Sequence, residues 1–316
     1  MHIHFLFNLK APIALFVYNR LQHTIKTVEA IKQAIGANDS DLFVFCDGAK
    51  EKDNVFLQNE ITEVRTYVKS INGFKTVQIV EQKSNLGLSK SIINGVSHLL
   101  EKNNAIIILE DDIVVGQDFL NFMNNALIKY ENEPQIAGIS GYSFPINEIA
   151  PYLTRTGSCW GWATYKRVWE DFIKKRDQLS LDLIATQEQD LFNVCGKVYS
   201  DMFLQTKRGI IQSWAVEFYL YYFSQKQFFL MPGLNLIANE GFDGSGVHSK
   251  KGNFLTDNNP IRSLSESVFP PQIKEEKHIR GKIEKLYQQG YAKPSMINSF
   301  VNKIKSVLLG NENNNH

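Results

Sequence analysis

The first 110 residues alternate between short apolar runs and segments whose apolar residues recur at helical spacing. Ile13–Tyr18 is such a run, and Ile25, Val28 and Ile31 follow it on one face of a helix. The predicted strands are Ile13–Tyr18, Leu42–Cys46, Thr76–Glu81 and Ile106–Leu109, and the predicted helices are Leu21–Ile35, Asn54–Ser70 and Leu88–Lys102. This alternation predicts a parallel sheet with right-handed crossovers.

The pattern becomes less regular after Pro145, where Gly, Trp and Tyr cluster. One further apolar and aromatic helix is predicted over Trp214–Ser224. The last segment is rich in lysine and predicts a helical tail. The second half of the chain is therefore expected to build on the sheet of the first half rather than to repeat it.

Composition places the chain among ordinary globular proteins. Its 316 residues are 43% hydrophobic and 21% charged, enough to bury a substantial core. The net charge of +1 creates no field that would attract nucleic acid, so no such partner is expected. Three scattered cysteines favour a reducing compartment, and no apolar run is long enough to span a membrane. These features predict a cytoplasmic protein.

The most informative junction is the passage from Ile106–Leu109 into Glu110-Asp111-Asp112. A continuous apolar run is typical of a strand buried on both faces. Three adjacent carboxylates cannot be buried without partners, so they must emerge at the sheet edge, where open α/β sheets bind ligands. Carboxylates gathered there suit Mg²⁺ or Mn²⁺, which would hold a diphosphate. The alternative is an acidic turn that caps the next helix.

Polar residues also follow the other predicted strands, at Tyr18-Asn19-Arg20, at Asp47-Gly48 and from Asn85 to Lys90. With these segments the chain resembles the GT-A-fold glycosyltransferases, particularly the bacterial family 2 type and its relatives with an EDD motif. The matching segments are FVYNR, FCDG, NLGLSKSIINGV, ILEDDI, CWGWATYKRVW and NEGFDGSGVH, which together span about residues 11–250.

The resemblance implies an α/β fold of the GT-A, Rossmann-like type. Its mainly parallel sheet would be flanked by helices, with an irregular acceptor-side region and a C-terminal helical tail. We therefore expect a glycosyltransferase domain over residues 1–265 and a helical extension over residues 266–316. Within the domain, residues 1–115 would bind the nucleotide and residues 116–265 the acceptor.

The resemblance also implies a nucleotide site. Its residues would be Val17, Tyr18 and Arg20 at the base, Asp47 at the base or ribose, Asn85 and Lys90 beside the nucleotide, and Asp111 at the ribose or donor sugar. For Asp47 the alternative is a turn residue before Gly48, and for Lys90 a solvated surface residue.

Two residues are expected to bind the metal. Asp112 follows the buried strand directly, and His248 lies in a glycine-containing loop that metal-dependent members of this fold return to the cation. A neutral imidazole can ligate Mn²⁺, whereas Mg²⁺ prefers oxygen. The implied cofactor is therefore Mn²⁺ or Mg²⁺.

The donor and acceptor sugars are expected to meet an aromatic segment. Trp160, Gly161 and Trp162 resemble the family's sugar-binding segment, and Trp214 is a further candidate. Aromatic faces can contact the C–H faces of pyranose rings, and Gly161 permits close approach. Packing in the core is the alternative for the tryptophans.

The catalytic base is where the sequence departs from the family pattern. Inverting relatives commonly place an acid just before the late helix, and that position falls near Trp214-Ala215, where Ala215 cannot accept a proton. Glu217 is the nearest acid and becomes the candidate general base. Pairing of Glu217 with Lys or Arg is the alternative, and Asp201 is the next candidate. Inversion is the favoured stereochemistry.

These observations predict a metal-dependent hexosyltransferase that uses a UDP- or GDP-sugar and a glycan or lipid-linked acceptor in surface polysaccharide or glycoconjugate synthesis. A sugar-1-phosphate nucleotidyltransferase would need a glycine-rich loop after the first strand, which Tyr18–Gln22 lacks. An inactive sugar-nucleotide-binding subunit is the other alternative. The apolar face of Met296–Leu309, with Lys303 and Lys305 beside it, predicts peripheral attachment to the membrane, or packing against the domain or a second subunit.

Overall fold

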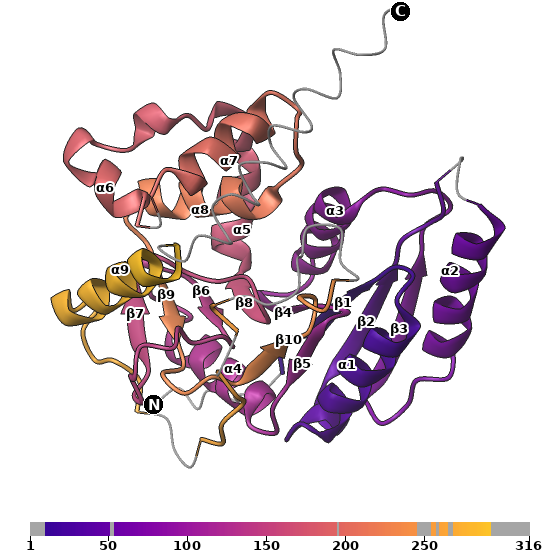
Figure 1. Cartoon of the computed structure of the whole chain (residues 1–316). Coiled ribbons are helices and arrows are strands. Elements are labelled where there is room, and N and C mark those ends of the chain that lie inside the picture. Colours follow the sequence, from indigo (N-terminus) through magenta and orange to yellow (C-terminus); the bar gives the residue numbers. More distant parts are fainter. Residues whose placement is uncertain are drawn as a thin grey trace, which may run out of the picture.

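The structure is a computed structural model that describes residues 10–50, 54–194, 196–244, 254–256, 259–264 and 268–291. Its centre is an eight-stranded sheet in the order β3-β2-β1-β4-β8-β6-β9-β7, which runs from right to left in Figure 1. The strands are β1 Ile13–Val17, β2 Asp41–Cys46, β3 Thr76–Glu81, β4 Ala105–Glu110, β6 Ile136–Ser140, β7 Tyr152–Thr154, β8 Trp162–Tyr165 and β9 Phe228–Met231. The predicted α/β fold class is confirmed.

The four strands predicted in the first half form the parallel part of this sheet. β1 lies between β2 and β4, with Phe16 beside Phe45 on one side and Glu110 on the other. All five residues of β1 are buried, as expected of a strand covered on both faces. The order β3-β2-β1-β4 reverses direction between β1 and β4, which makes that point the topological switch of the sheet.

Helices cover the two faces of the sheet in the way that right-handed crossovers require. α1 Leu21–Gln33 and α2 Val55–Val68 contact each other, because their crossovers run in the same direction along the sheet. The crossover through α3 Leu88–Leu100 runs back toward β4 and therefore places α3 on the opposite face. There α3 contacts α5 Lys166–Lys175 and α8 Trp214–Ser224. α4 Phe119–Lys129 packs against β6 and β8.

The second half adds two features that the sequence pattern did not predict. β8 runs antiparallel between β4 and β6, and β7 runs antiparallel to β9 at the sheet edge. Both strands have only three or four residues, too few to show a periodicity. A separate two-stranded sheet joins β5 Ile113–Val115 to β10 Ile237–Asn239.

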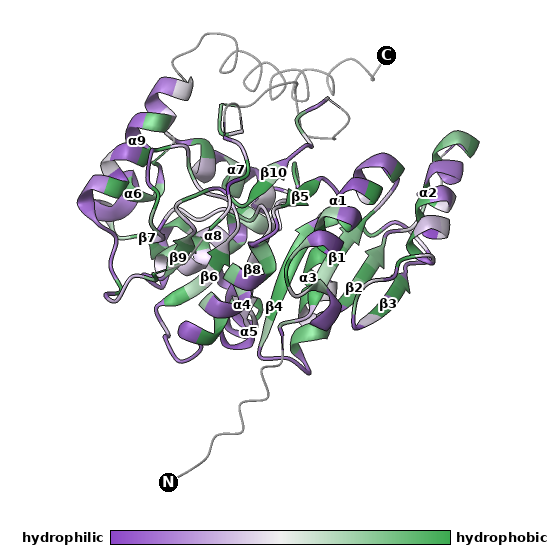
Figure 2. Cartoon of the chain, turned by 90° about the horizontal axis from the view of Figure 1, so that it is seen from below, coloured by the Kyte–Doolittle hydropathy of each residue, from purple (hydrophilic) through white to green (hydrophobic). Residues whose placement is uncertain are grey.

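A group of small helices lies between β8 and α8. It contains α6 Gln189–Phe192, α7 Val198–Lys207 and three 3₁₀ turns at Arg176–Gln178, Leu181–Leu183 and Thr186–Glu188; a fourth such turn, Ala37–Asp39, precedes β2. In Figure 2 the strands are mainly hydrophobic, whereas the outer sides of the helices are hydrophilic.

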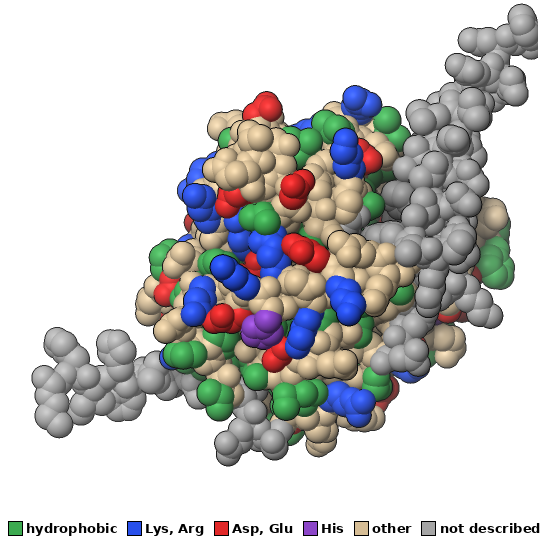
Figure 3. Space-filling model, turned by 60° about the vertical axis from the view of Figure 1, so that its left-hand side comes forward, with side chains coloured by type: hydrophobic (Ala, Val, Ile, Leu, Met, Phe, Trp, Pro, Cys, Tyr) green, Lys and Arg blue, Asp and Glu red, His purple; other side chains and the backbone are tan. Residues whose placement is uncertain are grey.

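The last described helix, α9 Lys277–Tyr291, packs against β7 and buries Ile279, Ile283 and Tyr287 in the same hydrophobic core. Figure 3 shows the side of the molecule that carries α9, where acidic and basic side chains are intermixed. Within the described residues, no helix combines the length and the apolar character needed to cross a membrane. The segment Met296–Leu309 and its predicted amphipathic helix lie outside the described residues.

Candidate functional site

The carboxyl ends of β1 and β4 meet at the topological switch of the sheet, and each leads into polar residues. Arg20 comes three residues after the end of β1, and Glu110 is the last residue of β4. In open α/β sheets, ligands bind in the crevice that forms where the strand order reverses. The acidic triplet and Arg20 therefore occupy the place in this fold where a ligand site is most expected.

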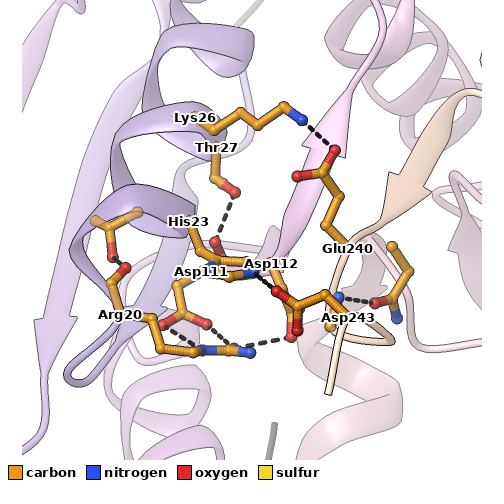
Figure 4. A network of polar contacts seen from close by, with 11 residues as sticks. Arg20, His23, Lys26, Thr27, Asp111, Asp112, Glu240 and Asp243 are labelled. Carbon is orange, nitrogen blue, oxygen red and sulfur yellow. Dashed lines mark hydrogen bonds and ion pairs between the residues drawn. The ribbon is translucent and has the colours of Figure 1, made fainter. Parts of the chain in front are cut away.

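The guanidinium of Arg20 contacts both aspartates of the triplet (Figure 4). One of its nitrogens, Nη2, donates to Asp111 Oδ1 and lies 2.8 Å from Asp112 Oδ2. The side chain of Asp111 is 6% exposed and that of Asp112 is 15% exposed. Thr27 Oγ1 on α1 donates to the Asp111 carbonyl at 2.8 Å and fixes the turn. One cation therefore faces two carboxylates, with a third beside them.

Burial and neighbouring charges together raise the pKa values of Asp111 and Glu110. Burial raises the pKa of Asp111 to about 6, although the neighbouring Arg20 acts to lower it. Burial, reinforced by the charges of Asp112 and Asp111, raises the pKa of Glu110 to about 8. An added cation would relieve this repulsion, so the electrostatics of the triplet favour cation binding.

A segment far away in the sequence closes over the triplet. β10 pairs antiparallel with β5, which begins directly after Asp112, and Glu240 N donates to the Asp112 carbonyl at 2.9 Å. A side chain at Gly241 would meet the Asp112 carboxylate, so the backbone of the segment after β10 passes close to this side chain. The sequence had predicted that the loop beyond this point returns to the cation site, and its described part lies beside Asp112.

Two side chains of α1 hold this loop in place, as Figure 4 shows. His23 Nε2 lies 3.1 Å from Asp243 Oδ2, and Lys26 pairs with Glu240. Sequence reasoning assigned no role to His23, Lys26 or Glu240. The NEGFDGSGVH segment was the sequence signal for this loop. That segment does not reveal which side chains of α1 the loop contacts. His248, the second predicted metal ligand, lies outside the described residues.

The donor set suits a hard cation that is shared with a substrate. Among the described residues, no group of three or more His, Cys, Asp and Glu side chains is arranged to hold a metal by itself. Mg²⁺ is commonly bound through only one or two carboxylates together with substrate phosphates and water. Asp112 and Asp111 supply such oxygens, so the residues present fit a cation carried by a diphosphate.

Asp47 at the end of β2 organises the loop that leads into α3. Its Oδ1 accepts from Gly48 N and Leu86 N, both at 2.8 Å, and its Oδ2 accepts from Gly87 N at 2.9 Å and from Asn85 Nδ2 at 3.0 Å. The residue is 8% exposed. Asp47 and Asn85 thus lie together, as a shared site requires. Both also shape the turn, which is the alternative that the sequence had left open for Asp47.

A cavity of about 240 Å³ opens beside Asp47, between β2, β3 and α3. Phe45 and Gly95 contribute to its apolar walls, and Ser91 and Asn94 add a hydroxyl and an amide. Ser91 Oγ is buried and has no hydrogen-bond partner among the described residues. The cavity is smaller than a typical whole-ligand site, so it suits one part of a ligand.

The other predicted nucleotide residues lie at the same sheet edge. Val17 is buried at the end of β1, and its carbonyl accepts from Asp47 N at 3.1 Å, whereas Tyr18 is half-buried. Lys90 lies in the first turn of α3 and is exposed. The structure therefore brings the residues of the predicted nucleotide site to one edge without testing what each of them binds.

Trp160 is the predicted sugar-binding residue best placed for this role. It is half-buried, and its ring meets Tyr142 at 4.9 Å and Phe242 at 5.5 Å between centroids. Phe242 belongs to the loop that closes over Asp112. Gly161 adopts φ 56°, which a glycine tolerates best, and turns the chain from Trp160 into β8. Trp160 is therefore close to the segment that contacts the acidic triplet.

Trp162 and Trp214 occupy a different environment. They are 1% and 4% exposed and stack on each other at 5.1 Å between centroids. Trp169 and Phe218 complete this aromatic layer between the sheet and the helices α5 and α8. As a correction to the predicted sugar contacts, the structure shows the core-packing alternative for both residues, because rings buried to this extent offer no face to a sugar.

Glu217 is buried beneath the small helices, where cations contact it. Arg176 Nη2 lies 2.6 Å and Arg176 Nε 2.8 Å from its Oε2, and Lys207 Nζ lies 3.7 Å from its Oε1. Its side chain is only 6% exposed. The catalytic role of Glu217 stays a prediction, and this geometry favours the alternative of a structural ion pair. Asp201, the next candidate, is exposed on α7.

Comparisons with known proteins add little to this picture. No family model matches the chain, and no curated protein sequence matches it. One solved structure that aligns with it is the mannosyltransferase PcManGT from Pyrobaculum calidifontis, in complex with GDP-Man and Mn²⁺, at 14% identity and a TM-score of 0.36. That alignment covers 52% of this chain and 46% of PcManGT, so the chain matches about half the length of that protein. HddC from Yersinia pseudotuberculosis aligns at 11% identity and a TM-score of 0.30, over 51% of this chain and 79% of HddC. Likenesses this weak carry no argument about activity.

Proposed function

We propose that this chain is a metal-dependent glycosyltransferase of the GT-A type. It would transfer a sugar from a UDP- or GDP-sugar to a glycan or lipid-linked acceptor in the synthesis of a surface polysaccharide or glycoconjugate. The observation that carries the proposal is the position of Asp111 and Asp112. They lie at the topological switch between β1 and β4, beneath a loop that arrives from β10.

The nucleoside of the donor would bind along the carboxyl edge of β1, β2 and β3. The cavity beside Asp47 offers apolar walls for a base, and the hydroxyl of Ser91 and the amide of Asn94 could bond to its edge. Asp47 and Asn85 shape the adjoining loop, and Tyr18 and Lys90 border it. Asp111 would then face the ribose or the donor sugar.

Asp112 would hold the metal together with the diphosphate, and His248 remains the proposed second ligand. When bound, Mn²⁺ or Mg²⁺ would neutralise the negative charge that develops on the departing diphosphate. Arg20 supplies a fixed cation beside the same carboxylates and would orient them toward the donor. The loop held by His23 and Lys26 would limit the access of water to the reacting carbon.

On the acceptor side, Trp160 is the proposed sugar platform and Phe242 its neighbour. Inversion remains the proposed stereochemistry. An inverting transfer needs a base within hydrogen-bond reach of the acceptor hydroxyl. The ion pair of Glu217 makes this residue a weaker candidate than the sequence indicated.

A screen of nucleotide sugars tests the proposal. The expected result is a rise in melting temperature with one UDP- or GDP-sugar that requires Mn²⁺ or Mg²⁺, because a ligand at 100 times its dissociation constant stabilises the fold by about 2.7 kcal/mol. The Asp112→Asn variant should lose the metal-dependent part of this rise. If no nucleotide sugar stabilises the parent protein in either metal, the proposal is wrong.

A second candidate is a sugar-nucleotide-binding subunit without transfer activity. Two observations support it. Ala215 stands in the position of the expected acid, and Glu217 forms ion pairs with Arg176 and Lys207. Release of free nucleotide from the stabilising donor, with and without candidate acceptors, separates the two functions. Release only in the presence of an acceptor supports the transferase.

A further inference from the structure

The carboxyl edge of the sheet carries exposed apolar side chains that no packing requirement explains. Val55 and Phe56 begin α2 and are each 71% exposed. Leu88 begins α3 and is 48% exposed, and Ile210, in the segment before α8, is 44% exposed. We call these four residues the apolar rim. Single exposed apolar side chains are common on protein surfaces, but several gathered at one edge are typical of an interaction surface.

The loops that carry the apolar rim contact one another. A side chain at Gly48 would collide with the backbone of Ser84, and Asn85 N donates to the Ala49 carbonyl at 3.1 Å. On the other side, Gly87 lies next to Gln212, two residues beyond Ile210. Because β2 and β3 are parallel, the starts of α2 and α3 share the upper edge of the sheet in Figure 1. The rim is therefore built on a fixed scaffold.

The charges beside the apolar rim have one sign in two of its three segments. Residues 83–90 contain Lys83 and Lys90 and no acidic residue, and residues 207–213 contain Lys207 and Arg208 and no acidic residue. Lys83, Lys90 and Arg208 are exposed. These two segments together carry four cations, whereas the whole chain has a net charge of only +1. Exposed apolar side chains among cations are the composition that binds an anionic lipid surface.

We infer that the apolar rim inserts into an anionic membrane surface and brings the carboxyl edge of the sheet against the lipid headgroups. Val55, Phe56, Leu88 and Ile210 would enter the boundary between headgroups and acyl chains, and Lys83 and Arg208 would contact lipid phosphates. The acidic triplet lies on the same edge. If the proposed function holds, on which this last step rests, the acceptor is a lipid-linked glycan presented at that surface.

Flotation of the full-length protein with vesicles tests the inference. The parent protein should float with vesicles of phosphatidylglycerol and phosphatidylcholine, and much less with phosphatidylcholine alone. The double variant Val55→Ser/Phe56→Ser should lower the partition coefficient by roughly tenfold or more, because two large apolar side chains no longer leave water. Lys83→Ser/Arg208→Ser should lower it by at least roughly tenfold, and less at high salt.

A matched control is available at the opposite edge of the sheet. Ile35 and Ile128 are 50% and 53% exposed, at the ends of α1 and α4 that lead toward the amino ends of strands. Ile35→Ser/Ile128→Ser should float as the parent does. All variants should keep the parent melting temperature, since the replaced side chains are exposed.

Several results would overturn the inference. One is a parent protein that does not float with anionic vesicles, and another is a rim variant that floats as well as the parent. A third is a control variant that loses as much binding as the rim variant. A rim variant that changes its oligomeric state while its flotation is unchanged would show that the rim is a contact between copies of the chain. Loss of binding only on truncation after Tyr291 would also overturn it. Nucleotide binding measured without vesicles reports on the proposed function separately.

Discussion

Among the ion pairs that arginine makes with carboxylates in the described part of the chain, two clusters differ in their charge balance. At the end of β4, Arg20 alone faces Asp111 and Asp112, with Glu110 beside them. On α8, Glu217 alone faces Arg176 and Lys207. The first cluster lies at the edge of the sheet where the ligand site is proposed, and the second lies beneath the small helices.

The difference shows how one pairing can serve two purposes. A carboxylate whose charge is fully compensated stabilises the packing around it and gains little from a further cation. The carboxyls of Glu110 and Asp111 have raised pKa values, first because they are buried and then because neighbouring carboxylates repel their charge. A cation would relieve that repulsion, which is why the acidic cluster, and not the compensated ion pair, is the proposed binding site.

The largest expected effect comes from removing the charge that is proposed to bind the metal. Asp112→Asn keeps the shape of the side chain and should lower metal-dependent turnover by more than about 10²-fold, because stabilisation of the departing diphosphate by a metal is on the order of several kcal/mol. Steady-state rates at limiting Mn²⁺ measure this. The fold should persist, as circular dichroism would show, and unchanged turnover would refute the metal role of Asp112.

The second prediction concerns the compensated cluster. Arg176→Met should lower the free energy of unfolding by about 3 kcal/mol, the low end for a broken buried pair, since Arg176 is partly exposed and Lys207 remains. Glu217→Gln should also destabilise the protein, while its turnover stays close to that of the parent. Denaturant unfolding and initial rates measure the two effects. If Glu217→Gln instead slowed turnover by about 10²-fold or more, its role as general base would be restored.

The third prediction separates the two roles of Asp47. Asp47→Ala should weaken the binding of free nucleotide by roughly 1–3 kcal/mol, because the proposed charge-assisted hydrogen bond from the base or ribose to this carboxylate is lost. Titration calorimetry with UDP and GDP measures the change. The control is Asp41→Ala, at the other end of β2. Parent-like affinity in Asp47→Ala would assign Asp47 to the turn alone.

The smallest expected effect is a pH dependence of stability. The pKa of Glu110 is raised from 4.5 to about 8, so the folded state holds a proton that the unfolded state releases. The associated stability is present below pH 4.5 and is lost as the pH rises through about 8. Between about pH 7 and pH 8 the metal-free protein should lose on the order of 1 kcal/mol. Thermal unfolding of Glu110→Gln at both pH values should show a smaller loss than the parent.

Much of the fold was predictable because the first half has strong local signals. The strands at Ile13, Leu42, Thr76 and Ile106 were placed within about one residue, since each is a short segment rich in apolar β-branched or aromatic residues beside a helix with regular spacing. The antiparallel strands β7 and β8 were missed because strands this short carry no period. For the tryptophans, the sequence shows which residues are aromatic but not how deeply each ring is buried. Trp160 and Trp162 were therefore given one role, although the first ring is half-buried and the second is fully buried.

The sequence by itself determined the α/β sheet, the emergence of Glu110, Asp111 and Asp112 at its edge, and the segments expected to meet there. These follow from local rules, because an apolar strand is buried and adjacent carboxylates need either partners or solvent. Only the tertiary structure decided that Arg20 contacts both aspartates and that His23 and Lys26 hold the loop after β10. It also decided that Arg176 forms an ion pair with Glu217. Such pairs join residues 41 or more positions apart, and their partners depend on how helices cross the sheet, which no local pattern of the chain contains.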